Sequence, residues 1–185
     1  FVADRSLPSV VPDEVGGGYN ATKILLEKGH KRVGFLNNID PIPATAARLQ
    51  GYLAALAAHG IAFDPALVVS DNSDPDGGQR AAQTVMQVPN PPTALFCFND
   101  RMAMGAYYAL RKLNLTVPDD VAVIGFDNQE IIAAHLNPGL STMELPHYAM
   151  GQWAINYLLE HLDPEDDMQP IQHSIECPYI ERFSV

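Results

Sequence analysis

The sequence predicts an α/β fold in which a parallel sheet is sandwiched by helices. Four short apolar runs, separated by stretches with helical periodicity, are RVGFL (32–36), ALVVS (66–70), TALFCF (93–98) and VAVIGF (121–126). The runs are continuously apolar rather than alternating, which is typical of strands buried on both faces. Regular alternation of such strands with helices favours a parallel sheet.

Two helices are predicted in the first third of the chain. Asp13 is a suitable N-cap for a helix that runs to Lys28 and stops at Gly29. From Ala46 to His59, apolar side chains recur three and four residues apart, and Gly60 provides the stop.

Three further helices are predicted. The turn-rich stretch DNSDPDGG (71–78) leads into one that reaches about Gln87, and Asp100 is a suitable N-cap for one from Arg101 to Leu113. Pro146 suits the first turn of a last helix. The wide apolar face of this last helix, which should pack against a substantial surface, consists of Met150, Trp153, Ala154, Tyr157 and Leu158.

The composition excludes several classes of protein. With 47% hydrophobic and 18% charged residues in 185, the chain is globular and can form one large or two small cores. A net charge of −11 leaves no dense basic stripe for nucleic-acid phosphates. No apolar run approaches the roughly 20 residues of a membrane-spanning helix, so no membrane partner is expected.

Two features concern the origin of the chain. Cys97 and Cys177 are too few for a disulfide framework, which favours reduced thiols in a cytoplasmic protein, although one bridge stays open. The start, FVADRSLPSVV, has no initiator Met and no signal-like segment, so we expect a piece of a longer protein.

Each of the four apolar runs ends in short polar side chains. These are Asn37 and Asn38, Asp71 and Asn72, Asn99 and Asp100, and Asp127 and Asn128. The carboxyl ends of parallel strands meet at one sheet edge, where open α/β folds bind ligands. Amides and carboxylates pair well with hydroxyl groups, which suits a polyol such as a sugar. The alternative is that these residues cap helices and form turns.

Other motifs do not support catalysis or a cofactor. GGGYNA (16–21) fits a dinucleotide-type glycine pattern but lies within a predicted helix rather than in a strand-to-helix turn. The six histidines lack metal-ligand spacing, and no nucleophile elbow is present. We therefore expect no cofactor, no metal and no enzyme activity.

Five stretches carry motifs in order along nearly the whole chain. They are ATKILLEKGHKRVGFL, ARLQGYLAALAAHGI with an R-x-x-G-Y helix, ALFCFNDRMAMGAYYALRKLNLTVPDDVAVIGFDNQE, NPGLSTM and ECPYIERFSV. The third contains ND-x-x-A-x-G followed by VP-x-D-V-x-V-I-G-F-D. Together they resemble the effector-binding region of the lactose-repressor/galactose-repressor (LacI/GalR) family of bacterial transcription regulators.

The resemblance implies a periplasmic-binding-protein-like type I fold with an effector between two α/β subdomains. By this analogy, residues 13–142 and 169–185 form a nearly complete carboxy-terminal subdomain. Residues 1–12 and 143–168 are remnants of the amino-terminal subdomain. The helix-turn-helix DNA-binding domain would lie outside this chain.

The resemblance also implies roles for individual residues. Effector contacts are expected from Arg48, Asn99 and Asp127, together with Asp4, Asn72 and Ser73. Two departures leave the effector open: no aromatic side chain lies near Asn72, and Glu144 and Leu145 stand where relatives often have other polar cleft residues. Dimer contacts are expected from Met102, Met104, Ile131 and His135, with core packing as the alternative.

Three functional hypotheses follow. The first is the effector-sensing region of a cytoplasmic, homodimeric repressor that binds a sugar-like ligand and reaches its DNA operator only through the missing domain. The second is an extracytoplasmic sugar-binding protein of a transport system, which a signal peptide in the parent gene would support. The third, a doubly wound enzyme, lacks a catalytic constellation in the sequence.

Overall fold

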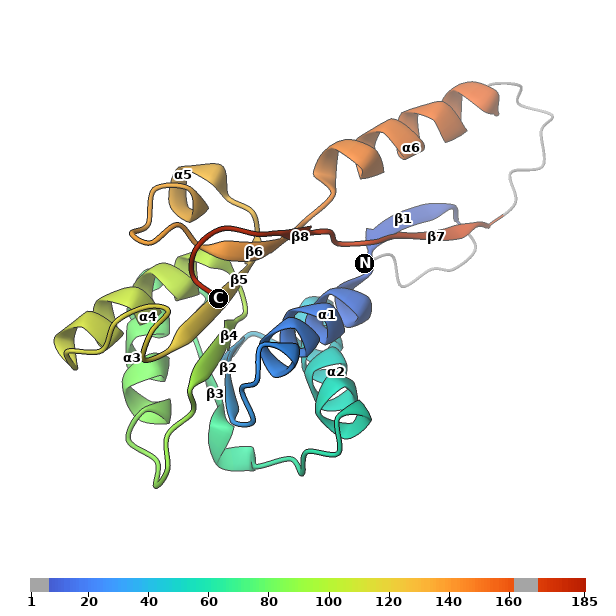
Figure 1. Cartoon of the computed structure of the whole chain (residues 1–185). Coiled ribbons are helices and arrows are strands. Elements are labelled where there is room, and N and C mark those ends of the chain that lie inside the picture. The colour runs from blue at the N-terminus through green and yellow to red at the C-terminus, as the bar shows by residue number, and fades with distance from the viewer. Residues whose placement is uncertain (1–6, 162–169) are drawn as a thin grey trace.

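The computed structural model describes residues 7–161 and 170–185. Figure 1 shows an open sheet with helices on both faces and an arm that extends away from it. Within the described ranges, no helix has both the length and the apolar character needed to cross a membrane.

In the described part of the chain, the main sheet contains six strands in the order β3-β2-β4-β5-β6-β8. Their bounds are β2 Val33–Asn38, β3 Val68–Asp71, β4 Ala94–Cys97, β5 Ala122–Asp127, β6 Ser141–Glu144 and β8 Tyr179–Ile180. Neighbouring strands are parallel except β6 and β8, which are antiparallel. The four apolar runs therefore form β2 to β5, and the predicted parallel pairing is confirmed.

Two pairs of helices cover the sheet. Figure 1 shows α1 and α2 on one face and α3 and α4 on the other. Their bounds are α1 Glu14–Glu27, α2 Pro43–Ala58, α3 Pro75–Val85 and α4 Asp100–Lys112. A short α5 (Glu130–Ala133) follows β5, and a 3₁₀ turn, η1 (Pro65–Leu67), precedes β3.

The helix starts confirm one predicted cap. The Asp13 carboxylate accepts a hydrogen bond from the Gly16 amide at 2.8 Å, as expected for an N-cap. Helix α2 begins at Pro43, three residues before the predicted start at Ala46. Proline suits this position because the first turn needs no donor from its nitrogen.

The predicted N-cap Asp100 is wrong, since the cap of α4 is Asn99. Asn99 has an extended backbone, and its side-chain oxygen accepts from the Met102 amide at 2.8 Å. Asp100 is the first residue of the helix, and its side chain is completely buried.

Aromatic packing joins the central strands to α2. The rings of Phe35 and Phe96 stack with their centroids 4.5 Å apart. The buried hydroxyl of Tyr52 donates to the Val33 carbonyl at 2.8 Å. Burial raises the pKa of the Tyr52 phenol, which keeps it protonated as that donor. Cys97 and Cys177 are both buried and both free.

The arm in Figure 1 contains a second, smaller sheet. Strand β1 (Ser9–Pro12) pairs in parallel with β7 (Gln172–Ile175), and α6 (His147–Glu160) packs on β1. These pairings differ from the predicted assignment at two points. Residues 172–175, expected with the main body, pair with β1, because that strand supplies the backbone partners for β7. Residues 143–144, expected with the other subdomain, lie in β6, because its pairing with β5 continues to Glu144.

The apolar face of α6 is only partly covered. Trp153 stacks on His173, with ring centroids 4.8 Å apart, and Tyr157 is buried. Leu158, which was expected to be packed, is 52% exposed. Among residues 7–161 and 170–185, the face therefore lacks the substantial partner surface that its width predicts.

The close packing of α1 on α2 gives a test of the fold. A Cβ added to Gly51 would meet the Val15 carbonyl and lie 2.5 Å from the Tyr19 nitrogen, both of which are backbone atoms. We expect Gly51→Ala to lower the free energy of unfolding by about 1–3 kcal/mol in urea denaturation, since backbone atoms cannot move aside easily. The control is Gly151→Ala in α6, where an added Cβ meets nothing within 4 Å. Equal stability of the two variants would contradict the expectation.

Candidate ligand-binding site

The strand order of the main sheet reverses at the carboxyl ends of β2 and β4. From β2 the chain passes outward to β3 at the sheet edge and then returns to β4 on the other side of β2. In open α/β sheets, ligands bind where the strand order reverses in this way. Asn37 and Asn38 end β2, and Asn99 follows β4 closely. We therefore look at this edge for the site residues that the sequence predicts.

Arg48 is the centre of the polar contacts at this edge. Its side chain is only 3% exposed, and its Nε donates to Glu14 Oε2 at 2.7 Å. One Nη donates to the Phe98 carbonyl, and the other lies 3.6 Å from Asp127 Oδ1. The guanidinium carbon also lies 3.6 Å from the centroid of the Phe126 ring. A buried guanidinium needs this kind of compensation, since an unpaired buried charge is strongly unfavourable.

Two carboxylates stand beside this single cation. The side chains of Glu14 and Asp127 are 18% and 17% exposed, so each keeps part of its surface accessible. Burial raises the pKa of Asp127, while the positive charge of Arg48 acts in the opposite direction. Since each carboxylate oxygen has two acceptor sites, both groups can accept further hydrogen bonds.

The backbone around Asp127 is strained. Its φ is 102°, and that of Asn128 is 52°. Left-handed conformations are uncommon for residues other than glycine and cost on the order of 1–3 kcal/mol unless the surroundings enforce them. The Gln129 amide side chain donates to Asp127 Oδ2 at 3.2 Å, which helps to orient the carboxylate.

The predicted effector residue Asn99 is engaged within the protein. Its oxygen caps α4, and its Nδ2 donates to the Ser73 carbonyl at 3.1 Å, with only 3% of the residue exposed. One hydrogen of the amide group is left for a ligand. Asn72 is exposed and Ser73 half-buried beside it. Asp4, also predicted, lies outside the described residues.

For several other polar strand ends, the structure supports the turn and capping alternative. The Asn37 and Asn38 side chains are buried and accept from backbone amides at 2.9 and 3.2 Å. Asp71 Oδ1 forms an ion pair with Arg80 at 2.6 Å. The Arg80 guanidinium accordingly lowers the pKa of the Asp71 carboxyl.

Sequence reasoning missed Glu14 and Gln129, and it named Asp100 only among the polar strand ends and as a helix cap. Glu14 appears in the sequence only as an acid in the first turn of a helix, and its distance from Arg48 is set by the packing of α1 on α2. Asp100 looked like a helix cap, and Gln129 carried no recognisable signal. Tertiary contacts were needed to identify all three.

Asp100 is a completely buried carboxyl directly behind the site. Oδ1 accepts from the Thr142 hydroxyl at 2.7 Å, and Oδ2 accepts from the Gln129 backbone amide at 2.6 Å. Burial raises the pKa of Asp100 to about 7; the nearby Asp127 charge adds to the rise, and the two hydrogen bonds and Arg182 oppose it.

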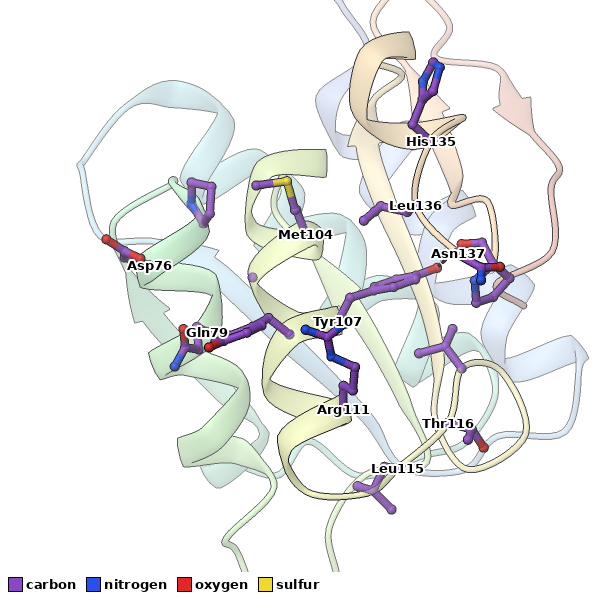
Figure 2. A pocket seen from close by; sticks show the side chains of 15 residues that line it. Asp76, Gln79, Met104, Tyr107, Arg111, Leu115, Thr116, His135, Leu136 and Asn137 are labelled. Carbon is purple, nitrogen blue, oxygen red and sulfur yellow. Dashed lines mark hydrogen bonds between the residues drawn. The ribbon is translucent and has the colours of Figure 1, made fainter.

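The four expected dimer residues have different environments. Met102 is completely buried, so the core alternative describes it. Met104 and Ile131 are 39% and 82% exposed, and His135 is also exposed. Figure 2 shows Met104 and His135 at a groove of about 820 Å³, where Tyr107 from α4 points toward the 136–138 loop. Arg48, Asn99 and Asp127 do not line this groove.

An open, mainly parallel sheet with polar groups at its reversal point is an arrangement in which α/β domains commonly bind ligands. Residues 22–185 match the family model of the periplasmic binding protein-like domain. The chain therefore belongs to that family. A sugar-binding transcriptional regulator of the LacI family from Escherichia coli is similar to it, with a TM-score of 0.86 at 34% identity over 96% of this chain and 63% of that one.

Individual relatives agree with this placement. The chain is 36% identical over 162 residues to the HTH-type transcriptional repressor CytR of Escherichia coli K12, which covers 88% of this chain and 47% of the repressor. The complex of the transcriptional regulator CelR with cellobiose superposes with a TM-score of 0.89 at 31% identity, covering 100% of this chain and 56% of that one. A LacI family regulator from Enterococcus faecium with bound ribose gives a TM-score of 0.84 at 26% identity over 96% and 64% of the two chains. The chain spans about half the length of CytR.

The buried Asp100 carboxyl predicts a pH dependence of stability. Its folded pKa of about 7 lies above the ordinary value of 3.8, so the native state binds the proton more tightly. The stabilisation is complete below about pH 4 and is lost as the pH rises to about 7. Asp100→Asn removes this titration. We therefore expect the free energy of unfolding of Asp100→Asn, relative to that of the unsubstituted protein, to rise between pH 4 and pH 8 by at most about 4 kcal/mol. Urea denaturation measures this difference.

Asp120→Asn is the matched control for this measurement. Hydrogen bonds from Thr116 lower the pKa of Asp120, so its stabilising contribution is lost as the pH falls. Between pH 4 and pH 8 that contribution is essentially complete, so the pH profile of Asp120→Asn should run parallel to that of the unsubstituted protein. Parallel pH profiles for Asp100→Asn and the unsubstituted protein would contradict the role of Asp100.

Proposed function

We propose that this chain senses a small sugar-like effector in a bacterial transcription regulator and controls DNA binding through a helix-turn-helix domain that this chain does not include. The observation that carries the proposal is the group formed by Arg48, Glu14 and Asp127 at the reversal point of the sheet. Family membership supports it, since CytR is a transcriptional repressor. The similarity to repressors favours this function over a transport protein or an enzyme.

The chemistry of the site suits a ligand rich in hydroxyl groups. Asp127 and Glu14 present partly exposed carboxylates, which can accept hydrogen bonds from neighbouring hydroxyls. Arg48 already binds protein acceptors with both ends of its guanidinium, so its main part is to hold the two carboxylates in place. The solved relatives with cellobiose and ribose support a sugar as the ligand class.

Control of DNA binding requires two arrangements with different affinity for the effector. The arm formed by β1, β7 and α6 joins the main sheet next to the site, because β1 leads into α1 at Glu14 and β6 leads toward α6. We place the second subdomain on this arm. An effector held between the two subdomains favours one closure state, which changes the spacing of two DNA-reading heads in a dimer.

The groove beside α4 is the proposed contact between two copies of the chain. Met104 and His135 line it, and Ile131 is exposed nearby on α5. A homodimer fits the two-fold symmetry of operators that dimeric regulators bind. Because the regulator acts on DNA, the proposed location is the cytoplasm.

Replacement of Asp127 tests the effector site. In the full-length protein, we expect Asp127→Asn to weaken the binding of D-ribose or cellobiose by about 10- to 100-fold, since hydrogen bonds to a charged acceptor are lost. Isothermal titration calorimetry measures the change. Asp76→Asn, an exposed carboxylate at the other groove, is the control and should bind normally. Unchanged affinity in Asp127→Asn would show that the site is wrongly assigned.

The two carboxylates predict discrimination against anions. Two negative groups beside one cation should repel a phosphate, so D-ribose should bind at least about tenfold more tightly than ribose 5-phosphate. Glu14→Gln should narrow this difference, because it removes one negative charge and frees Arg48 to attract the phosphate. Thermal-shift titrations of both proteins provide the comparison. Equal responses to the two compounds in the unsubstituted protein would refute the predicted selectivity.

A further inference from the structure

We propose that Asp100 is a positioning residue of the effector site, whose buried carboxylate holds the 127–129 segment in the strained conformation that presents Asp127. The inference rests on the proposed function in taking Asp127 as the effector acceptor. It adds a residue that the effector need not touch.

The contacts of Asp100 join three elements of the fold. Asp100 begins α4, Thr142 belongs to β6, and Gln129 precedes α5. The carboxylate accepts from the Thr142 hydroxyl at 2.7 Å and from the Gln129 backbone amide at 2.6 Å. Complete burial excludes water as a competing partner for these donors. The backbone just after Asp127 is therefore fixed to the core by a short, buried hydrogen bond to the Asp100 carboxyl group.

The backbone strain in the 127–129 segment explains why it needs this stabilising hydrogen bond. Asp127 has a φ of 102°, a conformation that residues other than glycine keep only where neighbouring contacts enforce it. Asn128 follows in the left-handed region, at 52°. Asp100 acts through the Gln129 amide. Arg182 also contacts the segment, because it donates to Asn128 Oδ1 at 2.9 Å. Without either hold, the segment can relax toward ordinary backbone angles.

The position of the Asp127 carboxylate depends on this conformation. With the segment held, Asp127 Oδ1 lies 3.6 Å from Arg48, and the Gln129 side chain donates to Oδ2. A change in φ at Asp127 would move its carboxylate relative to Arg48. Asp100 thus influences effector binding indirectly: it lies in the core and fixes the position of Asp127.

The core has room for the Asp100 carboxylate because the neighbouring strand residue is a glycine. A Cβ on Gly125 would collide with Asp100 Oδ1 and would lie 3.3 Å from the Thr142 hydroxyl oxygen. Gly125→Ala therefore displaces the carboxylate without changing its chemistry. This provides a second way to disturb the same contact.

Hydrogen exchange of the Gln129 amide tests the hold directly in the ligand-free, full-length protein. In Asp100→Ala we expect this amide to exchange about 10- to 100-fold faster, because its acceptor is gone. In Asp100→Asn the rate should stay within about threefold, since the amide oxygen can accept from Gln129 and the NH₂ can donate to Thr142. Gly125→Ala should accelerate exchange as well, which keeps the test available if Asp100→Ala does not fold.

Asp120→Ala is the matched control. Asp120 also accepts from a backbone amide and a threonine hydroxyl, both of Thr116, but at a loop away from the site. Its removal should leave the Gln129 rate unchanged. An unchanged Gln129 rate in Asp100→Ala would overturn the proposal, and so would equal acceleration at Gln129 and at strand amides such as Phe96, because that result indicates a general loss of stability.

Binding measurements connect the hold to the effector. Asp100→Ala should weaken D-ribose or cellobiose binding about tenfold or more, whereas Asp100→Asn should retain it. Faster exchange in Asp100→Ala with unchanged affinity would overturn the positioning role. If the unsubstituted protein binds neither sugar, the proposed function fails, while the exchange rates still decide whether Asp100 holds the segment.

Discussion

The buried guanidinium of Arg48 imposes the strictest requirement on the architecture near the site. A cation with 3% exposure must be neutralised and hydrogen-bonded, and here Glu14, Asp127 and the Phe98 carbonyl meet that need from three different elements. Helix α1, the end of β4 and the end of β5 must all converge on one side chain of α2. The candidate site is therefore organised around contacts between residues of the protein itself.

Close helix packing makes this convergence possible. A Cβ on Gly18 would lie 2.5 Å from the Arg48 carbonyl oxygen, and one on Gly51 would meet the backbone of α1. The glycine run that resembles a dinucleotide motif thus lies inside α1 and lets the helix backbones approach. That approach brings Glu14 within 2.7 Å of Arg48. The same glycines therefore serve both packing and the electrostatics of the site.

A second layer of buried polar groups supports the first. Asp100 and Arg182 hold the segment after β5, and the segment carries strain at Asp127. Strained backbone at a binding site is a common way to aim a side chain, provided that the surroundings enforce it. The C-terminal residues contribute here as well, since Ser184 accepts from the Ser141 amide and donates to the Val123 carbonyl. The last few residues of the chain are thus part of the framework behind the site.

The hydrophobic periodicity of the sequence and the polar residues at its predicted strand ends by themselves determined much of the predicted fold. Continuous apolar runs such as VAVIGF indicate doubly buried parallel strands, and their polar ends predict a ligand site at one edge of the sheet. Family motifs then select Arg48, Asn99 and Asp127 from many polar residues. The strand predictions succeed because side-chain period and turn chemistry are local properties that a sequence displays directly, whereas the effector contacts of these three residues stay predictions.

Only the tertiary structure decided which polar groups work together. The sequence does not display the approach of α1 to α2, so Glu14 could not be paired with Arg48. Nor does it show that Asn99 rather than Asp100 caps α4, which frees Asp100 to turn inward toward Thr142 and Gln129. The pairing of β7 with β1, across some 160 residues, likewise depends on backbone partners that are distant in the chain. Such contacts depend on the distance between elements in space, which local patterns do not encode.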